Sequence, residues 1–521
     1  MIRVKDVKIS FENNNDSFIK RKLEKIIGTK VISYSINKKS IDARKDILFV
    51  YTFDCVISDE DKVLKHNKSL FKTPIEEYEF KITGNKELLN RPLIVGAGPS
   101  GLFLAYMLSK YGYKPIIIEQ GEKIEDRVNT VEKFWKDNIL NELSNVQFGE
   151  GGAGTFSDGK LNTLVKDKLF RGKKVFEIFI ECGAPKEIMY EQKPHIGTDL
   201  LRKVIINLRN KIIEYGGSFK YNSKLTDLII KDNKIKSIII NDSETISTDA
   251  LFLCIWHSAR DTYELLDKRN VSMKSKPFAV GLRIEHKQED INKALYKKYY
   301  DKMDNASYKL TYKAKDNRGV YSFCMCPGGY VINASSEKGR LAINGMSNYK
   351  RESSMANSAI VVSVTENDFG HGLFDGVLFQ RKLEEQAYKI GKGNIPIQKY
   401  KDFKKNTITD SFIVKPEIKG NYTSANLNDL LPSYITDSIL EAMPHFKKQI
   451  SCFDDDDAIL LGIESRTSSP ITIIRDENGE SNVKGIYPVG EGAGYAGGIT
   501  TSCMDGLKQA ENFAKSFKPF N

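Results

Sequence analysis

Hydrophobic and polar positions along the chain predict three successive units. In residues 1–88 the pattern predicts a strand (IRVKDVKISF), an amphipathic helix (SFIKRKLEKIIG), two strands (VISYSI and DILFVYTFDCVI), a charged helix at residues 59–68 and a last strand (YEFKI). This β-α-β-β-α-β order is that of a ferredoxin-like α+β domain. The polar stretch TGNKELLNRP that follows is predicted to be a linker.

From residue 89 the pattern changes to short, wholly apolar strands followed by helices, which is typical of a parallel sheet buried on both faces. Near the C-terminus, GIYPVG and residues 500–515 return to the same strand-helix pattern. Between them lie longer, less regular elements such as PFAVGLRIEH. The expected fold class is therefore α/β: a Rossmann-like domain in two halves at residues 89–267 and 471–521, an inserted α+β substrate domain at 268–470, and an N-terminal ferredoxin-like α+β domain at 1–88.

A glycine-rich segment at residues 91–119 has the strongest chemical signal. The apolar strand LIV runs into a GxGxxG fingerprint whose residues are Gly96, Gly98, Pro99, Ser100 and Gly101. The glycines permit a tight turn and a close approach of the backbone to a pyrophosphate, which the positive end of the next helix attracts. Glu119 ends the following strand, where its carboxylate can accept hydrogen bonds from both adenosine ribose hydroxyls. The segment predicts a dinucleotide site.

A second motif decides which dinucleotide is expected. In GIYPVGEGAGYAGGITTSCMDG a strand is followed by Gly490 and Glu491, a glycine-rich turn and a helix. In flavoproteins of the glutathione-reductase-like class, such an acid binds the ribityl chain and the helix points its N-terminus at the flavin. The two motifs together predict FAD. Because the chain contains a single GxGxxG in the strand, helix, strand and acid context of a dinucleotide site, at residues 96–101, NAD(P)H would have to dock transiently if it is the electron donor.

Longer strings give a resemblance that covers essentially the whole chain. The sequence resembles the uncharacterised FAD-dependent dehydrogenases of bacteria that carry an N-terminal α+β domain. The segments responsible are SIDARKDILFVYT (40–52), FGEGGAGTFSDGKL (148–161), KPHIGTDLL (193–201), HSARDTYELL (257–266), KPFAVGLRIEH (276–286), FCMCPGG (323–329), INGMS (343–347) and ESRTSSP (464–470). In one departure, Trp256 stands where relatives usually have a small residue.

The motifs and the resemblance together imply a set of cofactor-binding residues. The set is Gly96, Gly98, Pro99, Ser100, Gly101, Glu119, Gln120, Arg127, Gly152, Ala153, Gly154, Leu225, Gly490, Glu491, Gly498 and Ile499. The run of N–H groups in the glycine-rich loop at 149–160 could form a nest over the pyrophosphate or beside the flavin. The alternative for this loop is a solvated tip.

Catalytic residues are left open, with four candidates: His195, His257, Lys160 and Arg283. Each histidine, like His286, could move a proton beside the flavin or be a structural residue with satisfied hydrogen bonds. Arg283, together with Glu464 and Arg466, either anchors an anionic substrate or forms a buried ion pair. Cys324 and Cys326 are predicted to be packing thiols rather than a redox disulfide.

Composition narrows the class of protein further. With 40% hydrophobic and 28% charged residues the chain is expected to be globular, and a net charge of +11 argues only weakly for an acidic partner. Seven cysteines lie scattered without the spacing of a disulfide framework or a zinc pair, so we expect a reducing compartment and no metal site. No apolar run approaches the ~20 residues that span a bilayer, and no signal peptide is evident. These features predict a cytoplasmic protein that does not bind a membrane.

Two functions fit the sequence best, and no residue excludes a third, a non-catalytic redox sensor or assembly factor. The first is an FAD-dependent oxidoreductase that transfers a hydride through flavin N5 to or from a small, anionic substrate bound by residues 268–470. The alternative is a flavin-dependent RNA-modifying enzyme. Residues 17–45 contain nine Lys or Arg against two acids, and three aromatic residues that could stack bases alternate along one strand, namely Phe49, Tyr51 and Phe53. The oligomeric state cannot be read from the sequence.

Overall fold

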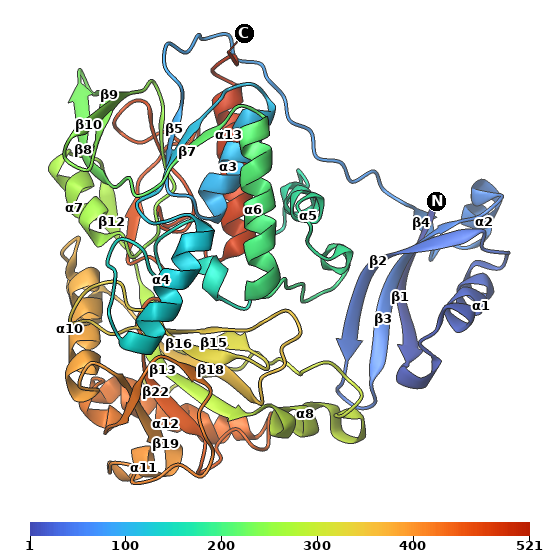
Figure 1. Ribbon diagram of the computed structural model, residues 1–521. Helices are drawn as coiled ribbons and strands as arrows, with labels where there is room; N and C mark the ends of the chain where they lie inside the picture. Colours follow the sequence, from blue (N-terminus) through green and yellow to red (C-terminus); the bar gives the residue numbers. More distant parts are fainter. Residues whose placement is uncertain (521) are drawn as a thin grey trace.

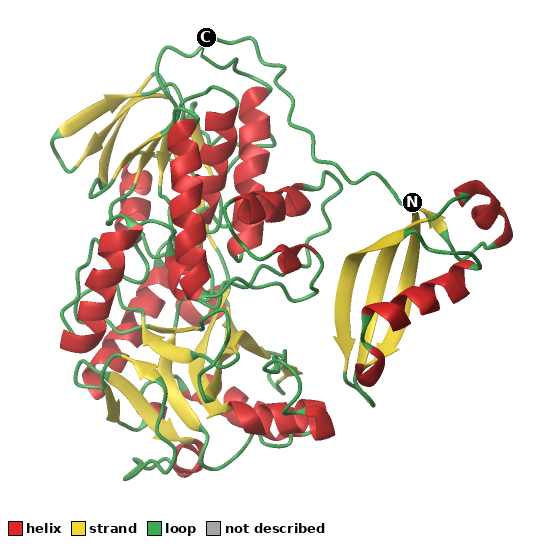
Figure 2. Ribbon diagram, turned by 45° about the vertical axis from the view of Figure 1, so that its right-hand side comes forward, coloured by secondary structure: helices red, strands yellow, loops and turns green. Residues whose placement is uncertain are grey.

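The first unit is a four-stranded antiparallel sheet with helices on one face (Figure 2). In the computed structural model, which describes residues 1–520, its strand order is β2-β3-β1-β4. The elements are β1 (Ile2–Ser10), α1 (Asp16–Ile27), β2 (Ser33–Asp42), β3 (Leu48–Val56), α2 (Glu60–His66) and β4 (Phe71–Lys72). The Asn15 side chain caps α1 by accepting a hydrogen bond from the Phe18 N–H.

The aromatic side chains of β3 form the core of this unit. Phe49, Tyr51 and Phe53 are at most 7% exposed and pack with Leu23 and other apolar residues of α1. Tyr51 also donates a hydrogen bond to Asn14. Side chains buried in this way are not available to stack bases, so the surface on which the RNA alternative depends is absent from this strand.

The predicted last strand of the unit is not part of its sheet. Instead of YEFKI, the fourth strand is β4 at residues 71–72, and residues 73–90 run as an extended segment to the second unit (Figure 1). The Tyr78 hydroxyl donates to Glu511, and Phe80 stacks on Tyr111 with ring centroids 4.2 Å apart. The alternation of apolar residues therefore marks an extended segment with one buried face, but helices rather than a strand cover that face.

The second unit contains a five-stranded parallel sheet in the order β24-β11-β5-β6-β7. Helices α3, α6 and α13 lie side by side against it in Figure 1. A three-stranded antiparallel sheet, β10-β9-β8, is inserted before β11. The elements are β5 (Leu93–Val95), α3 (Pro99–Lys110), β6 (Ile116–Ile118), α4 (Ile124–Asp137), α5 (Arg171–Glu181), α6 (Thr198–Glu214), β7 (Ser218–Lys220), β8 (Leu225–Lys231), β9 (Lys234–Ile240), β10 (Glu244–Ser247), β11 (Leu251–Leu253), α7 (Arg260–Lys268), β24 (Ile486–Pro488) and α13 (Ile499–Ala514).

The third unit is built on a mixed seven-stranded sheet in the order β14-β15-β18-β13-β22-β19-β21, with two smaller sheets beside it, β12-β23 and β17-β16-β20. The elements are β12 (Met273–Ser275), β13 (Phe278–Lys287), α8 (Gln288–Tyr296), β14 (Thr311–Lys313), β15 (Gly319–Cys326), β16 (Tyr330–Asn333), β17 (Ile343–Met346), β18 (Met355–Val364), α9 (Glu366–Phe369), α10 (Asp375–Ile390), β19 (Ile395–Lys399), α11 (Tyr400–Lys405), β20 (Ile418–Lys419), β21 (Tyr422–Ser424), α12 (Ser433–Lys447), β22 (Ile459–Glu464) and β23 (Ile471–Ile473). The predicted mixed α/β fold is confirmed.

The faces of the seven-stranded sheet differ in what covers them. One face packs on α8, α10 and α12 and forms the main core of the unit. The opposite face, on the side of the second unit in Figure 1, carries a small separate cluster of Ala279, Ala359 and Val361, with Tyr321 and Phe323 partly buried beside it. These three side chains are at most 1% exposed, so this face is also covered, although its apolar cluster is much smaller.

The first unit contacts both of the others. Its β2 strand exchanges backbone hydrogen bonds between Lys39 and residues 190 and 192 of the second unit, and the Lys39 ammonium lies 2.8 Å from a Glu191 carboxylate oxygen. Phe11 packs on Tyr299 of the third unit with ring centroids 5.3 Å apart. Within residues 1–520, no helix has the length and apolar character needed to cross a membrane.

Candidate active site

A cleft of about 670 Å³ opens where the strands of the parallel sheet end. Its walls come from the turn after β5, the end of β6, residues 147–152 at the start of the glycine-rich loop, the turn after β11 and the turn after β24. The residues that line it are Val95, Gly96, Gly98, Pro99, Ser100, Ile118, Glu119, Gln120, Gln147, Phe148, Gly149, Gly152, Ser223, Leu225, Cys254, Ile255, Trp256, Ala259, Thr262, Glu491 and Ser502. The carboxyl edge of a parallel sheet is where doubly wound folds bind ligands.

In the GxGxxG turn, neighbouring backbone atoms leave no room for a side chain at Gly96 or Gly101. Gly96 has φ +103°, and a Cβ on it would lie 2.4 Å from the Cys254 carbonyl oxygen. A Cβ on Gly101 would lie 2.0 Å from the Gly96 carbonyl oxygen. The first intrahelical bond of α3 runs from the Leu102 N–H to the Gly98 carbonyl, so the N–H groups before Leu102 have no acceptor within the helix. The turn therefore presents free donors and a positive helix end to the cleft.

The glycine-rich loop lies directly against this turn. The Gly151 N–H donates to the Ala97 carbonyl at 2.8 Å, and a Cβ on Gly152 would lie 3.1 Å from the Gly98 Cα. Arg127 holds the loop from behind: its guanidinium is fully buried and donates to carbonyl oxygens of Asn145, Val146, Gly149, Glu150 and Gly152. Arg127 is not among the residues that line the cleft, so in this structure it positions the loop.

Glu119 joins three segments around the cleft. Its carboxylate accepts hydrogen bonds from the N–H groups of Ala97, Gly121 and Gly149 at 2.8–3.0 Å. A carboxylate has about four acceptor positions, so one remains for a ligand hydroxyl. The Glu119 side chain therefore fixes the two glycine loops as well as facing the cleft.

Glu491 is the residue whose surroundings point most clearly to a bound ligand. Its carboxylate lines the cleft and is only 7% exposed, yet no hydrogen-bond donor of residues 1–520 contacts it, and His257 Nε2 is 4.0 Å away. Burial raises the pKa of this carboxyl to about 8, although Lys276 works in the opposite direction. Hydroxyl groups of a ribityl chain would supply the absent donors, so the residues present fit a bound FAD.

The other predicted cofactor residues lie around the same space. Gln120 and Leu225 line the cleft at the side of Glu119, and a Cβ on Gly490 would lie 2.5 Å from the Ser100 hydroxyl oxygen. Gly498 caps the N-terminus of α13, where the Ile499 side chain reaches Gly154. Ala153 is buried next to Gly154. The structure thus brings the N-terminal and C-terminal halves of the expected set together around one space.

His257 lies beside Glu491 but is closed off from solvent. It is 1% exposed, and neither ring nitrogen has a hydrogen-bond partner within residues 1–520. Burial, together with the charges of Arg466 and Arg260, lowers its pKa to about 3. The imidazole is therefore neutral at physiological pH and cannot serve there as a cationic acid.

A group of cations lies between the second and third units, just after the glycine-rich loop. Arg351 pairs with the buried Asp158 carboxylate at 2.7 Å, and the Lys160 ammonium lies 3.7 Å from the same carboxylate and donates to the Met325 carbonyl. Lys193 lies close enough for the charges of Arg351 and Lys160, together with burial, to lower its pKa. Burial and the charge of Arg351 likewise lower the pKa of His195. Lys160 and Arg351 thus face one carboxylate, and Lys193, whose ammonium donates to Ser307, adds a third positive charge nearby. The group has a net positive charge and attracts anions.

Cys324 borders the cationic group. Its side chain is exposed, and desolvation by the surrounding protein atoms raises the thiol pKa to about 12. The charge of Lys160 acts on this thiol in the opposite direction. Cys326 is buried, and its thiol donates to the Cys324 carbonyl. Both thiols are free.

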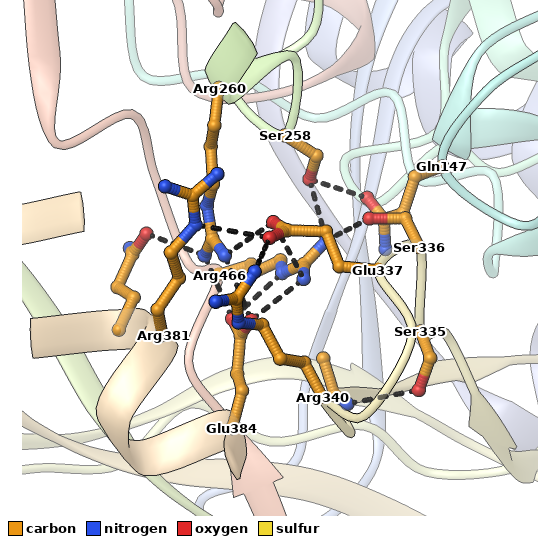
Figure 3. A network of polar contacts seen from close by, with 12 residues as sticks. Gln147, Ser258, Arg260, Ser335, Ser336, Glu337, Arg340, Arg381, Glu384 and Arg466 are labelled. Atoms are coloured by element: carbon orange, nitrogen blue, oxygen red, sulfur yellow. Dashed lines mark hydrogen bonds and ion pairs between the residues drawn. The ribbon is translucent and has the colours of Figure 1, made fainter. Parts of the chain in front are cut away.

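Two other candidates, Arg283 and Arg466, form buried ion pairs. Their guanidinium N–H groups donate within the protein rather than toward a ligand. The Arg283 guanidinium is fully buried and bonds to Glu464, Asn357, Asn344 and the Cys324 carbonyl. Arg466 and Arg260 both make bidentate contacts with Glu384 (Figure 3). His286 donates one hydrogen bond from Nε2 to the Phe453 carbonyl inside the core, while its Nδ1 is buried without a partner in residues 1–520. Of the alternatives open in the sequence, the structure shows the buried ion pair for Arg283 and Arg466, and it places His286 in the core with only one of its two ring nitrogens bonded.

The sequence did not single out several residues that the structure places at the site. Gln147 lines the cleft and accepts a hydrogen bond from the Trp256 indole at 2.6 Å. Lys193 and Arg351 belong to the cationic group. Lys193 begins the family string KPHIGTDLL, but nothing in the periodicity around Gln147 or Arg351 predicts that these residues meet the glycine-rich loop.

Comparisons with known proteins agree with this geometry. The family described as "FAD-dependent protein, C-terminal domain-like" matches residues 277–467, and the NAD(P)-binding Rossmann-like domain matches residues 94–139. A protein of Clostridium beijerinckii described as uncharacterized is 45% identical over 530 residues, which covers 99% of each chain. The FAD expected from the two glycine motifs is thereby confirmed.

Solved structures give only distant likenesses. Glycerol-3-phosphate dehydrogenase from Bacillus halodurans, complexed with FAD, is 9% identical over 84% of this chain and 67% of its own, with a TM-score of 0.36. Glycine oxidase from Bacillus cereus is 9% identical over 82% of this chain and 98% of its own, with a TM-score of 0.34. At such scores neither structure assigns an activity.

Proposed function

We propose, from the premise that the chain belongs to a family of FAD-dependent proteins, that it is an oxidoreductase acting on a small organic anion. The observation behind this proposal is the cationic group at the junction of the second and third units, where Lys160 and Arg351 face the single carboxylate of Asp158 and Lys193 adds a third positive charge nearby. When bound, FAD supplies hydride transfer at its N5 atom. The protein supplies the binding and orientation of both partners.

The roles of the residues follow from their positions. The open N–H groups at the start of α3 would hold the pyrophosphate, Glu119 the adenosine ribose and Glu491 the ribityl chain, as in the glutathione-reductase-like class. The loop that contains Lys160 lies against the start of α13, because the Thr500 hydroxyl donates to the Leu161 carbonyl at 2.6 Å. The cationic group is thereby kept next to the helix end expected to face the flavin.

The substrate would have an apolar part as well as an anionic group. Tyr321 and Phe323 are partly buried beside Ala359 on the face of the seven-stranded sheet that lies on the side of the second unit, and the same strand continues to Cys324. An apolar wall that leads to a cluster of cations suits a carboxylate or phosphate attached to a hydrocarbon skeleton. His195, whose Nε2 lies 3.0 Å from the Tyr349 carbonyl oxygen, is the titratable group proposed to move a proton there. NAD(P)H remains a proposed transient electron donor.

The test measures anion binding near the flavin. Benzoate is titrated into the FAD-loaded protein, and the visible absorbance of the flavin is followed. We expect a saturable spectral change and an affinity at least about tenfold weaker in Lys160→Met, because a charge-assisted hydrogen bond is lost. The matched control is Lys166→Met, which removes an exposed charge from the adjoining loop and should bind benzoate as the natural protein does.

Hydride transfer itself is tested by anaerobic mixing with small organic acids that carry a hydroxyl or amino group on an oxidisable carbon. Loss of flavin absorbance with one of them, slowed in Lys160→Met and not in Lys166→Met, supports the proposal. Benzoate binding that is identical in all three proteins would contradict the assignment of the cationic group.

A further inference from the structure

A second cavity lies away from the cofactor cleft and is lined by residues of α4, of the start of α6 and of the sheet β17-β16-β20. In Figure 1, α4 and α6 lie next to β16. The cavity encloses about 1040 Å³ when its open mouth is included. Trp135 and Met346 are among the apolar residues that line it, and Arg202 of α6 is the cation that enters it from the second unit. We call this cavity the α4–α6 groove. It shares no lining residue with the cofactor cleft.

Arg202 is exceptional among the arginines of residues 1–520. It is the one whose guanidinium makes no hydrogen bond or ion pair, and its Nε atom is buried without a partner. One face of the guanidinium lies over the Phe156 ring at 4.7 Å. A guanidinium stacked in this way keeps its N–H edge free, and that edge matches two oxygens of a carboxylate or phosphate.

The protein does not supply the missing anion. Glu132 and Asp199 line the same groove and favour the charged form of Arg202, but neither lies within 4.0 Å of it, and Asp199 accepts a hydrogen bond from the Tyr349 N–H at 2.7 Å. Lys136 and Lys419 add two further cations to the lining. Burying a guanidinium without a partner costs free energy that a bound anion would recover.

We propose that the α4–α6 groove binds a small organic anion whose carboxylate or phosphate oxygens pair with the Arg202 guanidinium. Lys136 and Lys419 approach the same oxygens from the groove lining, and the edge of Trp135 and the Met346 side chain contact the apolar part of the ligand. The site lies outside the proposed substrate site and does not depend on it. Phe156, which belongs to the glycine-rich loop, lies between the guanidinium groups of Arg127 and Arg202.

The test uses the two tryptophans of the chain, Trp135 in the groove and Trp256 in the cofactor cleft. The FAD-loaded protein is labelled with 5-fluorotryptophan, and the two fluorine resonances are assigned with a Trp256→Phe variant. Phenyl phosphate, benzoate and the neutral benzyl alcohol are then titrated separately. We expect either anion to shift the Trp135 resonance saturably, and the alcohol to have no such effect.

Two substitutions on α6 decide whether Arg202 is responsible. Arg202→Gln should weaken the anion by at least about tenfold, because charge-assisted hydrogen bonds are lost. Lys203→Gln removes the same charge from the next, exposed residue and should bind as the natural protein does. A response to phenyl phosphate alone, or to benzoate alone, supports the site and selects its head group. An unmoved Trp135 resonance with both anions, or equal affinities in Arg202→Gln and the natural protein, would overturn the proposal.

Discussion

At the scale of single residues, the buried carboxylates of this protein fall into two groups: those that accept hydrogen bonds from arginine side chains and those that accept none. Glu464 accepts hydrogen bonds from Arg283, and Glu384 from two arginines, whereas Glu491 faces the cleft without a donor. Burial without compensation raises the pKa of Glu491 to about 8. An acid left in this state inside a ligand cleft is a sign of function, because a purely structural carboxylate would have acquired donors.

This pKa predicts how pH affects the FAD-free protein. An unfolded glutamate titrates near ~4.3, so between that pH and about 8 the folded state binds more protons than the unfolded state. The free energy of unfolding should therefore decrease as pH rises through this range, by at most about 1.4 kcal/mol per pH unit from this group. Glu491→Gln should have a shallower pH dependence, measured by urea unfolding at several pH values.

The same substitution has a second readout. Glu491→Gln should bind FAD at least about tenfold more weakly, because charge-assisted hydrogen bonds to ribityl hydroxyls are lost. Glu285 also has a pKa raised by burial to about 8, and its contribution is common to both proteins, so the comparison isolates Glu491. Identical pH dependence and identical FAD affinity in the two proteins would place Glu491 outside the cofactor site.

At the scale of elements, the glycine-rich loop depends on a single arginine. Five backbone carbonyls of residues 145–152 accept hydrogen bonds from Arg127, so the loop has a fixed shape although it contains no strand or long helix. Gly149 has φ +120°, and a Cβ there would lie 2.4 Å from the Arg127 Cδ atom. The loop tolerates no side chain at this position.

Gly149→Ala should consequently destabilise the loop and weaken FAD binding by about tenfold or more, since both backbone strain and the displacement of Arg127 oppose it. The control is Gly497→Ala in the C-terminal glycine turn, where a Cβ would meet no atom within 4 Å. FAD affinity by fluorescence titration and thermal unfolding give the comparison. Equal FAD affinity in the two variants would show that the contact with Arg127 does not matter for binding.

At the scale of the whole molecule, the second and third units are joined by a buried charge network (Figure 3). Arg260 at the start of α7 and Arg466 after β22 both bind Glu384 of α10, and Glu337 lies 2.7 Å from Arg260. Burial alone would raise the pKa of Glu384, but the two guanidinium groups hold it well below its usual range. The network fixes the junction at which the cofactor cleft and the cationic group lie.

Glu384→Gln should lower the free energy of unfolding by about 3–5 kcal/mol, because two guanidinium groups lose their shared buried counter-ion. The neighbouring Glu385 is the matched control: its side chain is 53% exposed and pairs with Arg340, so Glu385→Gln should cost about 1 kcal/mol or less. Urea unfolding of the FAD-loaded protein, followed by flavin fluorescence, measures both. Comparable losses in the two variants would mean that the network does not hold the units together.

The sequence by itself determined the features that depend on local backbone requirements. The GxGxxG turn, the turn after GIYPVG and the helices after them need particular residues at fixed spacing, so FAD and the α/β fold could be predicted and are confirmed. The paired glycines at 96 and 101 fit only a turn of this kind. Such requirements can be read along the chain because the positive φ of Gly96 and the contact between Gly101 and the Gly96 carbonyl arise within a few residues.

Only the tertiary structure decided which polar side chains meet across the chain. Periodicity shows that Arg283 lies on a strand, but not that its guanidinium donates to Glu464 of the neighbouring strand β22. It also cannot show that Arg127 of α4 is enclosed by the carbonyl oxygens of residues 145–152. Lys160, Lys193 and Arg351 become one cationic group because three loops from two units converge. Tyr78 and Phe80 alternate as in a strand, yet they contact Glu511 of α13 and Tyr111 at the end of α3. Contacts between distant segments depend on how the elements pack, and local periodicity does not record that packing.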